Sequence, residues 1–307
     1  MFETLTAGSL GTPRRVQRRV ASWLASFAVN AQLFGIRPGV VVAVPGRLCH
    51  SLPLYAALEG MHLGAHVHLL DGLRPDRAAE VMRARAVEVV YATPTQMRLM
   101  LGGAGWPALR HVVLGGERLD AGLRAGIGLA APGARITEFY GAAETSFITM
   151  TDAATPAGSV GRAYPGVHIE IRHGEIWVAS PYVALGDGWV SVAEMGYQEG
   201  GYLYLQGRAG RMVTIAGQNV FPEQIEGWMA GLPGIARVAV FAVPDAARGH
   251  VLMAAAQGDA GQTGAIMAAL RAHLGALVAP RALIWPDPWP TLASGKTDLA
   301  ALQRVQV

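Results

Sequence analysis

A single lysine stands near the end of this 307-residue sequence, within the segment PTLASGKTDLAAL at residues 290–302. The sequence contains 25 Lys and Arg residues, and all of them except Lys296 are arginines. A lysine carries its charge on a slender, flexible stem and can enter a narrow gap, whereas the guanidinium of arginine is wider and planar. Lys296 is therefore a candidate for chemistry that needs a compact positive charge.

A second candidate is the loop TAGSLGTPRR at residues 6–15, which is rich in small and hydroxyl residues. Such residues let backbone N–H groups close around a phosphate, and the arginines that follow add positive charge. The segment is expected to be a phosphate-binding loop that enters a helix. It lacks the Gly-Lys-Ser/Thr spacing of Walker-type loops, which disfavours that class. From these residues alone, an ordinary turn is the alternative.

A third candidate is EFYGAAETS at residues 138–146, which reads as the end of a strand followed by Gly141 and then Glu144. In an open parallel sheet the carboxyl ends of the strands face the ligand crevice. At such a place Tyr140 could stack on a base and Glu144 could hold a cation.

The composition excludes several classes of protein. With 51% hydrophobic and 15% charged residues the chain is globular, and a net charge of +3 with scattered arginines argues against nucleic acid. Cys49 is the only cysteine, so a disulfide framework and a cysteine metal site are excluded. His62, His66 and His68 could form a metal cluster, but AHVHLL at residues 65–70 reads as a buried strand, and no carboxylate pattern completes a metal site.

An apolar run at residues 20–36, VASWLASFAVNAQLFGI, resembles the core of a secretion signal. Ser22, Ser26, Asn30 and Gln32 interrupt it at helical spacing, however, and favour an amphipathic helix. No stretch has the continuous apolar length of a membrane span. We therefore expect a cytoplasmic protein.

Short apolar runs alternate with helix-like segments through the first half of the sequence, which predicts an α/β fold with a mostly parallel sheet covered by helices. After residue 158 the alternating runs predict an antiparallel β region, and the last third predicts a small α+β domain. The expected domains are residues 1–208 and 209–307. The glycine-rich segment 207–226 indicates a mobile junction between them or, alternatively, a hairpin followed by a helix.

In their order and separation these segments resemble the motifs of the adenylate-forming superfamily, which includes acyl-CoA and aryl-CoA ligases. TAGSLGTPR resembles its phosphate loop, LGGE at residues 114–117 its adenine-side loop, and YGAAE its YGxTE motif. GWVSVAEMG at residues 188–196 resembles GWxxTGDxG, residues 207–226 resemble the hinge and the loop after it, and PTLASGKTDLAAL resembles the terminal PxTxxGKxxR segment. The resemblance spans nearly the whole chain.

The resemblance implies an ATP- and Mg²⁺-dependent ligase that joins a small carboxylic acid to CoA or to the phosphopantetheine of an acyl carrier protein. By position, the phosphates would be held by Thr6, Gly8, Ser9, Gly11 and Arg14, the adenine by Gly115, Gly116, Glu117 and Tyr140, and the ribose by Glu194 and Arg208. Glu144 would bind Mg²⁺, His50 would lie at the acyl pocket, Lys296 would bridge the carboxylate and phosphate oxygens, and Gly217 would line the thiol channel.

The sequence also departs from the family pattern. Leu10 and Ala143 stand where the family usually has threonine, and Leu299 stands at the terminal arginine. A catalytically degenerate binding or scaffold protein is therefore the alternative function. Only five residues precede Thr6, whereas family members carry a substantial N-terminal portion. We expect an exposed apolar face and strand edge there, and with them a homo-oligomer or a partner.

Overall fold

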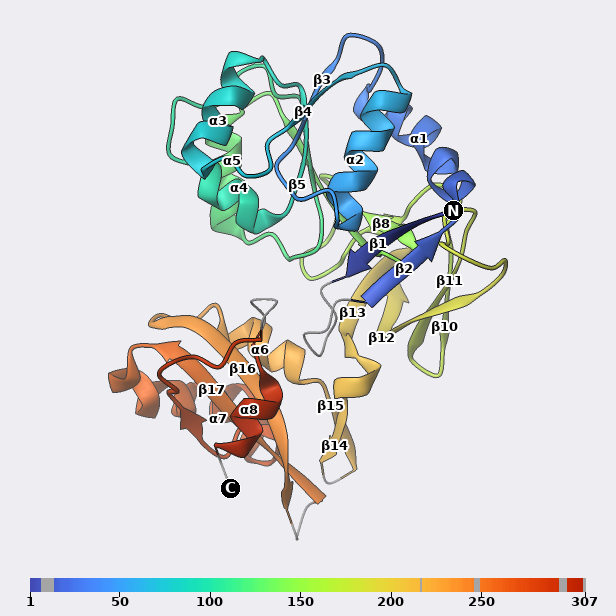
Figure 1. Cartoon of the computed structure of the whole chain (residues 1–307). Helices are drawn as coiled ribbons and strands as arrows, with labels where there is room; N and C mark the ends of the chain where they lie inside the picture. The colour runs from blue at the N-terminus through green and yellow to red at the C-terminus, as the bar shows by residue number, and fades with distance from the viewer. Residues whose placement is uncertain (7–13, 216, 246–248, 293–296, 306–307) are drawn as a thin grey trace. The chain divides into compact units, whose positions relative to one another are not determined.

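The computed structural model describes the chain except for residues 7–13, 216, 246–248, 293–296 and 306–307 (Figure 1). Its described residues form two compact units. The first comprises Met1–Thr6, Arg14–Val192 and Tyr197–Tyr204, and the second lies within Ala193–Gly196 and Leu205–Val307.

The first unit contains a seven-stranded sheet in the order β4-β3-β5-β6-β7-β8-β9. The strands are β3 (Val41–Val44), β4 (His66–Leu69), β5 (Val89–Ala92), β6 (His111–Leu114), β7 (Arg135–Ala142), β8 (Ser146–Met150) and β9 (Arg162–Ala163). The pairs from β4 to β7 are parallel, and β7–β8 and β8–β9 are antiparallel. The predicted α/β fold with a mostly parallel sheet is confirmed.

Five helices belong to this sheet: α1 (Val20–Phe34), α2 (Ser51–His62), α3 (Pro75–Ala84), α4 (Pro94–Met100) and α5 (Ala121–Ala130). Helices α3, α4 and α5 lie together and α1 packs beside α2 (Figure 1). Local signals fix their starts: a capping box of Thr93 and Gln96 opens α4, and the side chain of Asp120 caps α5. Among the described residues, no helix is long and apolar enough to cross a membrane.

The N-terminal segment differs from its prediction. β1 (Phe2–Thr6) and β2 (Arg14–Arg18) form an antiparallel hairpin, in which Thr6 lies opposite Arg14 and Phe2 opposite Arg18. The expected helix after the loop was therefore wrong: a strand follows first, and the helix begins at Val20. Pairing with β1 supplies backbone partners that no local signal in the sequence announces.

An antiparallel sheet has the strand order β10-β11-β12-β13; β10 and β11 belong to the first unit, whereas the residues of β12 and β13 are divided between the two units. Its strands are β10 (His168–Arg172), β11 (Glu175–Ala179), β12 (Val190–Glu199) and β13 (Tyr202–Arg208). His173 and Gly174 connect β10 to β11 with φ of 52° and 82°, a two-residue turn that matches strand twist. The antiparallel region predicted after residue 158 is thereby confirmed.

The second unit is a small α+β arrangement, as predicted. It contains η1 (Ala209–Arg211), β14 (Val213–Ile215), β15 (Gln218–Val220), α6 (Pro222–Met229), β16 (Ile235–Asp245), β17 (Gly249–Gly258), η2 (Ala260–Gln262), α7 (Thr263–Val278), β18 (Leu283–Ile284) and α8 (Leu299–Arg304). β14 and β15 form a hairpin, and β16, β17 and β18 form a three-stranded sheet. A core of buried apolar side chains from α6, α7 and this sheet stabilises the unit.

One burial expectation was wrong. The strand His66–Leu69 exists, but it is the edge strand β4, and His66 and Leu69 are exposed. Helix α1 forms as expected, yet its polar residues Ser22, Ser26 and Asn30 point inward and are buried. They are tolerated there because each makes hydrogen bonds with other buried side chains.

Candidate active site

A cavity of about 270 Å³ lies in the first unit, at the carboxyl ends of the parallel strands. Its walls combine aromatic rings, glycines and a few polar groups. They are formed by Arg18, Trp23, Gly46, Arg47, His50, Ser51, Leu52, Pro53, Tyr55, Tyr91, Thr93, Gln96, Gly115, Gly116, Phe139, Gly141, Ala142, Ala143, Ser146 and Phe147. Ligands of open α/β sheets bind at this end, where the loops leave the strands.

Three of the predicted site residues meet at this cavity: His50, Gly115 and Gly116. Gly115 follows β6, and a Cβ atom there would come within 2.2 Å of the Phe139 ring, so no larger residue fits. His50 precedes α2 and forms a bridge with Leu5, which ties the start of that helix to the N-terminal hairpin. Segments from three separate parts of the chain thus form one wall.

The turn that carries Glu144 borders the same cavity. It joins β7 to β8, which pair through Ala142 and Ser146, and Ala142, Ala143 and Ser146 line the cavity. A Cβ atom on Gly141 would lie 2.0 Å from the Ser146 carbonyl oxygen, and Ser146 has a φ of 58°, so the turn is tight and strained. Glu144 is half-buried, and its carbonyl accepts a hydrogen bond of 2.8 Å from the Ala184 N–H.

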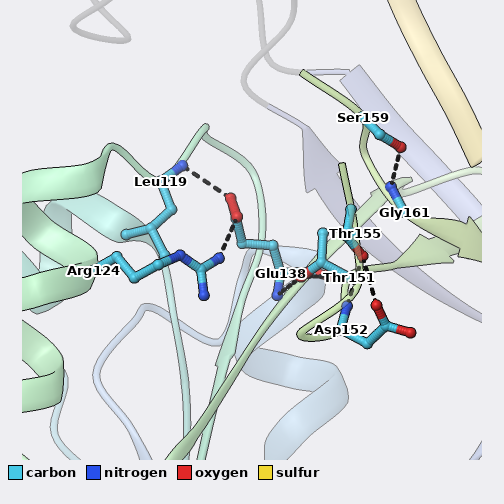
Figure 2. A network of polar contacts seen from close by, with 8 residues as sticks. All are labelled: Leu119, Arg124, Glu138, Thr151, Asp152, Thr155, Ser159 and Gly161. Atoms are coloured by element: carbon cyan, nitrogen blue, oxygen red, sulfur yellow. Dashed lines mark hydrogen bonds and ion pairs between the residues drawn. The ribbon is translucent and has the colours of Figure 1, made fainter. Parts of the chain in front are cut away.

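The loop after Gly116 is held by a second glutamate, Glu138, which the sequence did not single out. Its carboxylate accepts hydrogen bonds from the Leu119 N–H at 3.1 Å and from the Arg124 guanidinium at 3.0 Å. Figure 2 shows this carboxylate pointing toward Leu119 and Arg124, while the backbone of Glu138 is bound by Thr151. Glu138 therefore joins the loop after Gly116 to strand β7.

The other two residues predicted to frame adenine do not line the cavity. Glu117 is exposed, and its carboxylate accepts hydrogen bonds from the Thr95 hydroxyl at 2.5 Å and the Thr95 N–H at 3.2 Å. Tyr140 is half-buried in β7, opposite Thr149 of β8. Both are neighbours in sequence of the residues that do line the cavity.

A buried polar network lies behind the aromatic wall, and the sequence analysis missed it. The Glu59 carboxylate accepts hydrogen bonds from Asn30 Nδ2 at 2.8 Å and from the Tyr91 hydroxyl. Asn30 also binds the hydroxyls of Tyr55 and Tyr164, at 3.0 and 2.8 Å. Burial raises the pKa of Glu59 from 4.5 to about 7, although these hydrogen bonds act in the opposite direction. The sequence did contain a signal for this network, because the polar residues Asn30 and Glu59 stand within the otherwise apolar helices α1 and α2.

Several other predicted residues are not placed at the cavity by the structure. Gly8, Ser9, Gly11 and Lys296 lie outside the described residues. Thr6 and Arg14 pair with each other in the hairpin, as the last residue of β1 and the first of β2.

Three further predicted residues belong to the second unit. Glu194 lies in β12, Arg208 ends β13 and is exposed, and Gly217 lies at the β14–β15 turn with a φ of 82°.

Among the described residues, no group of three or more His, Cys, Asp or Glu side chains is arranged for a metal ion. Mg²⁺ is usually held by one or two carboxylates together with substrate phosphates and water. Glu144 beside the cavity is a carboxylate of that kind.

Comparison with known families gives two matches. The family described as AMP-binding enzyme matches residues 3–186, and the AMP-binding enzyme C-terminal domain matches residues 224–296. The first match alone covers more than half of the chain.

Individual relatives agree with the family matches. The chain is 31% identical to the acyl–CoA ligase YhfT of Bacillus subtilis (strain 168), itself uncharacterised, over 95% of this chain and 65% of that protein. It is 27% identical to a 3-hydroxybenzoate–CoA ligase of Aromatoleum sp. (strain CIB), over 99% of this chain and 66% of that protein. The chain thus spans just under two thirds of the length of these relatives.

Solved structures share the fold. O-succinylbenzoate coenzyme A synthetase (MenE) from Bacillus subtilis, in complex with ATP and magnesium ion, superposes with a TM-score of 0.85 at 22% identity, covering 98% of this chain and 69% of that one. ATP-bound MatB from Rhodopseudomonas palustris superposes with a TM-score of 0.83 at 23% identity, covering 99% and 67%.

Proposed function

The chain belongs to the family of AMP-binding enzymes, and on that premise we propose that it is an ATP-dependent carboxylic acid–thiol ligase. In the first half-reaction a carboxylate oxygen attacks the α-phosphorus of ATP, giving an acyl adenylate and releasing pyrophosphate. In the second, the sulfur of CoA or of a carrier-protein phosphopantetheine attacks the acyl carbonyl, and AMP leaves.

The observation that carries this proposal is the convergence of separate motifs on one cavity. His50, the glycine pair Gly115–Gly116 and the turn that bears Glu144 are far apart in the sequence, yet residues of all three border the same space. A ligand-binding cleft with a few polar groups on an otherwise apolar wall is the usual form of a small-molecule site.

The acid proposed is a small aromatic one. A cavity of about 150 Å³ holds benzene, so a cavity of about 270 Å³ has room for one substituted ring but little for a long acyl chain. Trp23, Tyr55, Tyr91, Phe139 and Phe147 supply an aromatic wall that suits such a ring. The 3-hydroxybenzoate–CoA ligase among the relatives supports the same class of acid.

The phosphates are assigned to the loop between β1 and β2, with Thr6, Gly8, Ser9, Gly11 and Arg14 as donors. Their proposed task is to neutralise charge on the phosphate oxygens as the carboxylate attacks. Mg²⁺, when bound, supplies further neutralisation, and Glu144 is the residue proposed to hold it.

The remaining roles follow the family pattern. Glu117 and Tyr140 are proposed to contact adenine, Glu194 and Arg208 the ribose, and Gly217 the thiol. Lys296 is proposed to bind the carboxylate and phosphate oxygens during adenylation.

Exchange of labelled pyrophosphate into ATP tests the first half-reaction. We expect exchange that requires Mg²⁺ and is faster with benzoate or hydroxybenzoates than with hexanoate or palmitate. Glu144→Gln is the matched variant, because it removes the charge proposed to bind Mg²⁺ while keeping nearly the same shape. A folded wild-type protein that exchanges with no acid would favour the degenerate binding or scaffold protein instead.

A further inference from the structure

Arg18, the last residue of β2, is a completely buried arginine at the wall of the cavity, with an exposed fraction of 0%. Its guanidinium makes three hydrogen bonds. Nη1 donates to the Ser22 hydroxyl at 2.9 Å and to the Tyr182 carbonyl at 2.7 Å, and Nη2 donates to the Ala143 carbonyl at 2.5 Å. All three acceptors are neutral.

The charge of Arg18 has no counterion within its hydrogen-bonding shell. In the described part of the chain no carboxylate lies within 4.0 Å of its nitrogens, and its buried Nε has no hydrogen-bond partner. Burial lowers the pKa of Arg18 to about 10, against the raising effect of the Glu144 carboxylate, so the side chain stays charged at neutral pH. Moving a charge out of water costs several kcal/mol, so a neutral side chain would suit a merely structural role better.

The hydrogen bonds of Arg18 converge on the peptide groups around Glu144. Arg18 binds the carbonyl of Ala143, and the carbonyl of Glu144 itself accepts from the Ala184 N–H at 2.8 Å. The other nitrogen of Arg18 binds the Tyr182 carbonyl, two residues before Ala184. One guanidinium thus joins the two segments that hold the Glu144 backbone.

The turn needs such support because it is strained. Ser146 keeps its positive φ while its hydroxyl accepts a hydrogen bond of 3.2 Å from Trp23 Nε1. The Trp23 ring lies 5.3 Å from the Arg18 guanidinium carbon. A strained conformation persists only where its surroundings fix it, and Arg18 and Trp23 together fix both sides of this turn.

We propose that Arg18 is a positioning residue for Glu144: its planar guanidinium fixes the Ala143–Glu144 backbone so that the carboxylate is held ready for a divalent metal bound with nucleotide. This inference rests on the proposed function in one respect, the assignment of Glu144 as the metal-binding residue. Shape matters as well as charge, because two nitrogens of one rigid group bind two separate segments. Lysine keeps the charge but cannot hold both segments in that geometry.

Binding of Mn²⁺ in the presence of a non-hydrolysable ATP analogue tests this without any acid substrate. Electron paramagnetic resonance on the full chain gives the affinity directly. Because loss of a residue that orients a metal ligand typically weakens binding by about 10- to 100-fold, Arg18→Met and Arg18→Lys are both expected to lose about tenfold or more. Arg19→Met is the control, since Arg19 binds Gly186 and Asp187 from the solvent side.

Hydrogen exchange provides a second readout that a poorly folded variant cannot imitate. The Ala184 amide, which binds the Glu144 carbonyl, should exchange about tenfold faster in Arg18→Lys, as expected for loss of a hydrogen bond to a charged group. Amides in the β16–β17 sheet of the second unit should exchange as in the wild type. In an active preparation, the variant should raise the apparent KM for Mg²⁺ more than it lowers kcat.

The outcomes separate this inference from the proposed function. If the wild type binds Mn²⁺ with nucleotide but exchanges pyrophosphate with no acid, the ligase proposal fails and the role of Arg18 is still tested by the variants. Unchanged Mn²⁺ affinity in a folded Arg18→Lys protein overturns the inference, and so does a wild type that binds no Mn²⁺ with nucleotide. If Arg18→Met does not fold, Arg18→Lys and the Ala184 amide decide the matter.

Discussion

Replacement of Glu59 by glutamine should remove a distinct pH dependence from the stability of the protein. Glu59 has an exposed fraction of 0%, and its hydrogen-bond donors, Asn30 and the Tyr91 hydroxyl, are uncharged. Among the described residues, no cation contributes to the pKa shift of its carboxyl group. An ionised carboxylate in this place is therefore disfavoured by burial, and its pKa rises from 4.5 to about 7.

The size and sign of the effect follow from this rise. Between the two pKa values the folded protein binds more protons than the unfolded chain, so the free energy of unfolding falls as the pH rises. A rise from 4.5 to about 7 corresponds, at about 1.4 kcal/mol per pH unit, to about 3 kcal/mol lost by pH 8. In Glu59→Gln this loss disappears, while the amide can still accept from Asn30.

Urea unfolding of both proteins at pH 4.5 and pH 8 measures the effect. The fall in the free energy of unfolding between these pH values should be about 3 kcal/mol larger for the wild type than for Glu59→Gln. Glu80→Gln, at an exposed glutamate that pairs with Arg77, should follow the wild type. Parallel pH profiles for the wild type and Glu59→Gln would refute the reasoning, because Glu59 would then keep an ordinary pKa in the fold.

Three further predictions concern the cavity and the lone lysine. Gly141→Ala should lower the free energy of unfolding by about 2 kcal/mol, since the new methyl group meets the Ser146 carbonyl; a thermal unfolding midpoint equal to that of the wild type would contradict this. Phe147→Leu should lower the free energy of unfolding by about 1 to 2 kcal/mol and shift pyrophosphate exchange toward acids with bulkier ring substituents. An unchanged preference among acids would mean that the ring of the acid does not bind beside Phe147. Lys296→Arg should slow exchange by about 100-fold, and near-normal exchange would show that charge alone suffices.

The elements with local signals could be predicted from the sequence. Helix α4 begins where Thr93, Pro94 and Gln96 form a capping box with proline in the first turn, and all of that information lies within four residues. Strand β2 carries no comparable signal. It exists because β1 pairs with it, and the same arginine-rich segment was expected to enter a helix.

The residues of the candidate site also fall into two groups, those with a local sequence signal and those without one. Gly115 and Gly141 stand in short motifs, and the structure gives each a physical reason, the close approach of the Phe139 ring and of the Ser146 carbonyl. Arg18 belonged to no motif. Its partners Ala143 and Tyr182 follow it by 125 and 164 residues, and no local pattern records a contact between positions so far apart.

Helix α1 shows why the spacing of polar and apolar residues could not by itself identify the buried polar side chains. A spacing of three to four residues predicts a helix with two different faces, but it does not say which face turns inward. Here Ser22, Ser26 and Asn30 face the interior, while Val20 and Leu24 are 50% and 40% exposed.

The inward polar face of α1 connects two fully buried side chains of the first unit, the basic Arg18 and the acidic Glu59. Ser22 binds the cation Arg18, and Asn30 binds the carboxylate of Glu59. Buried polar groups that are hydrogen-bonded restrict the ways in which helices can pack, because a shifted helix would leave several of them unpaired. The side chains that make α1 atypical therefore fix it against the aromatic wall, and with it the shape of the cavity that Trp23, Tyr55 and Tyr91 enclose.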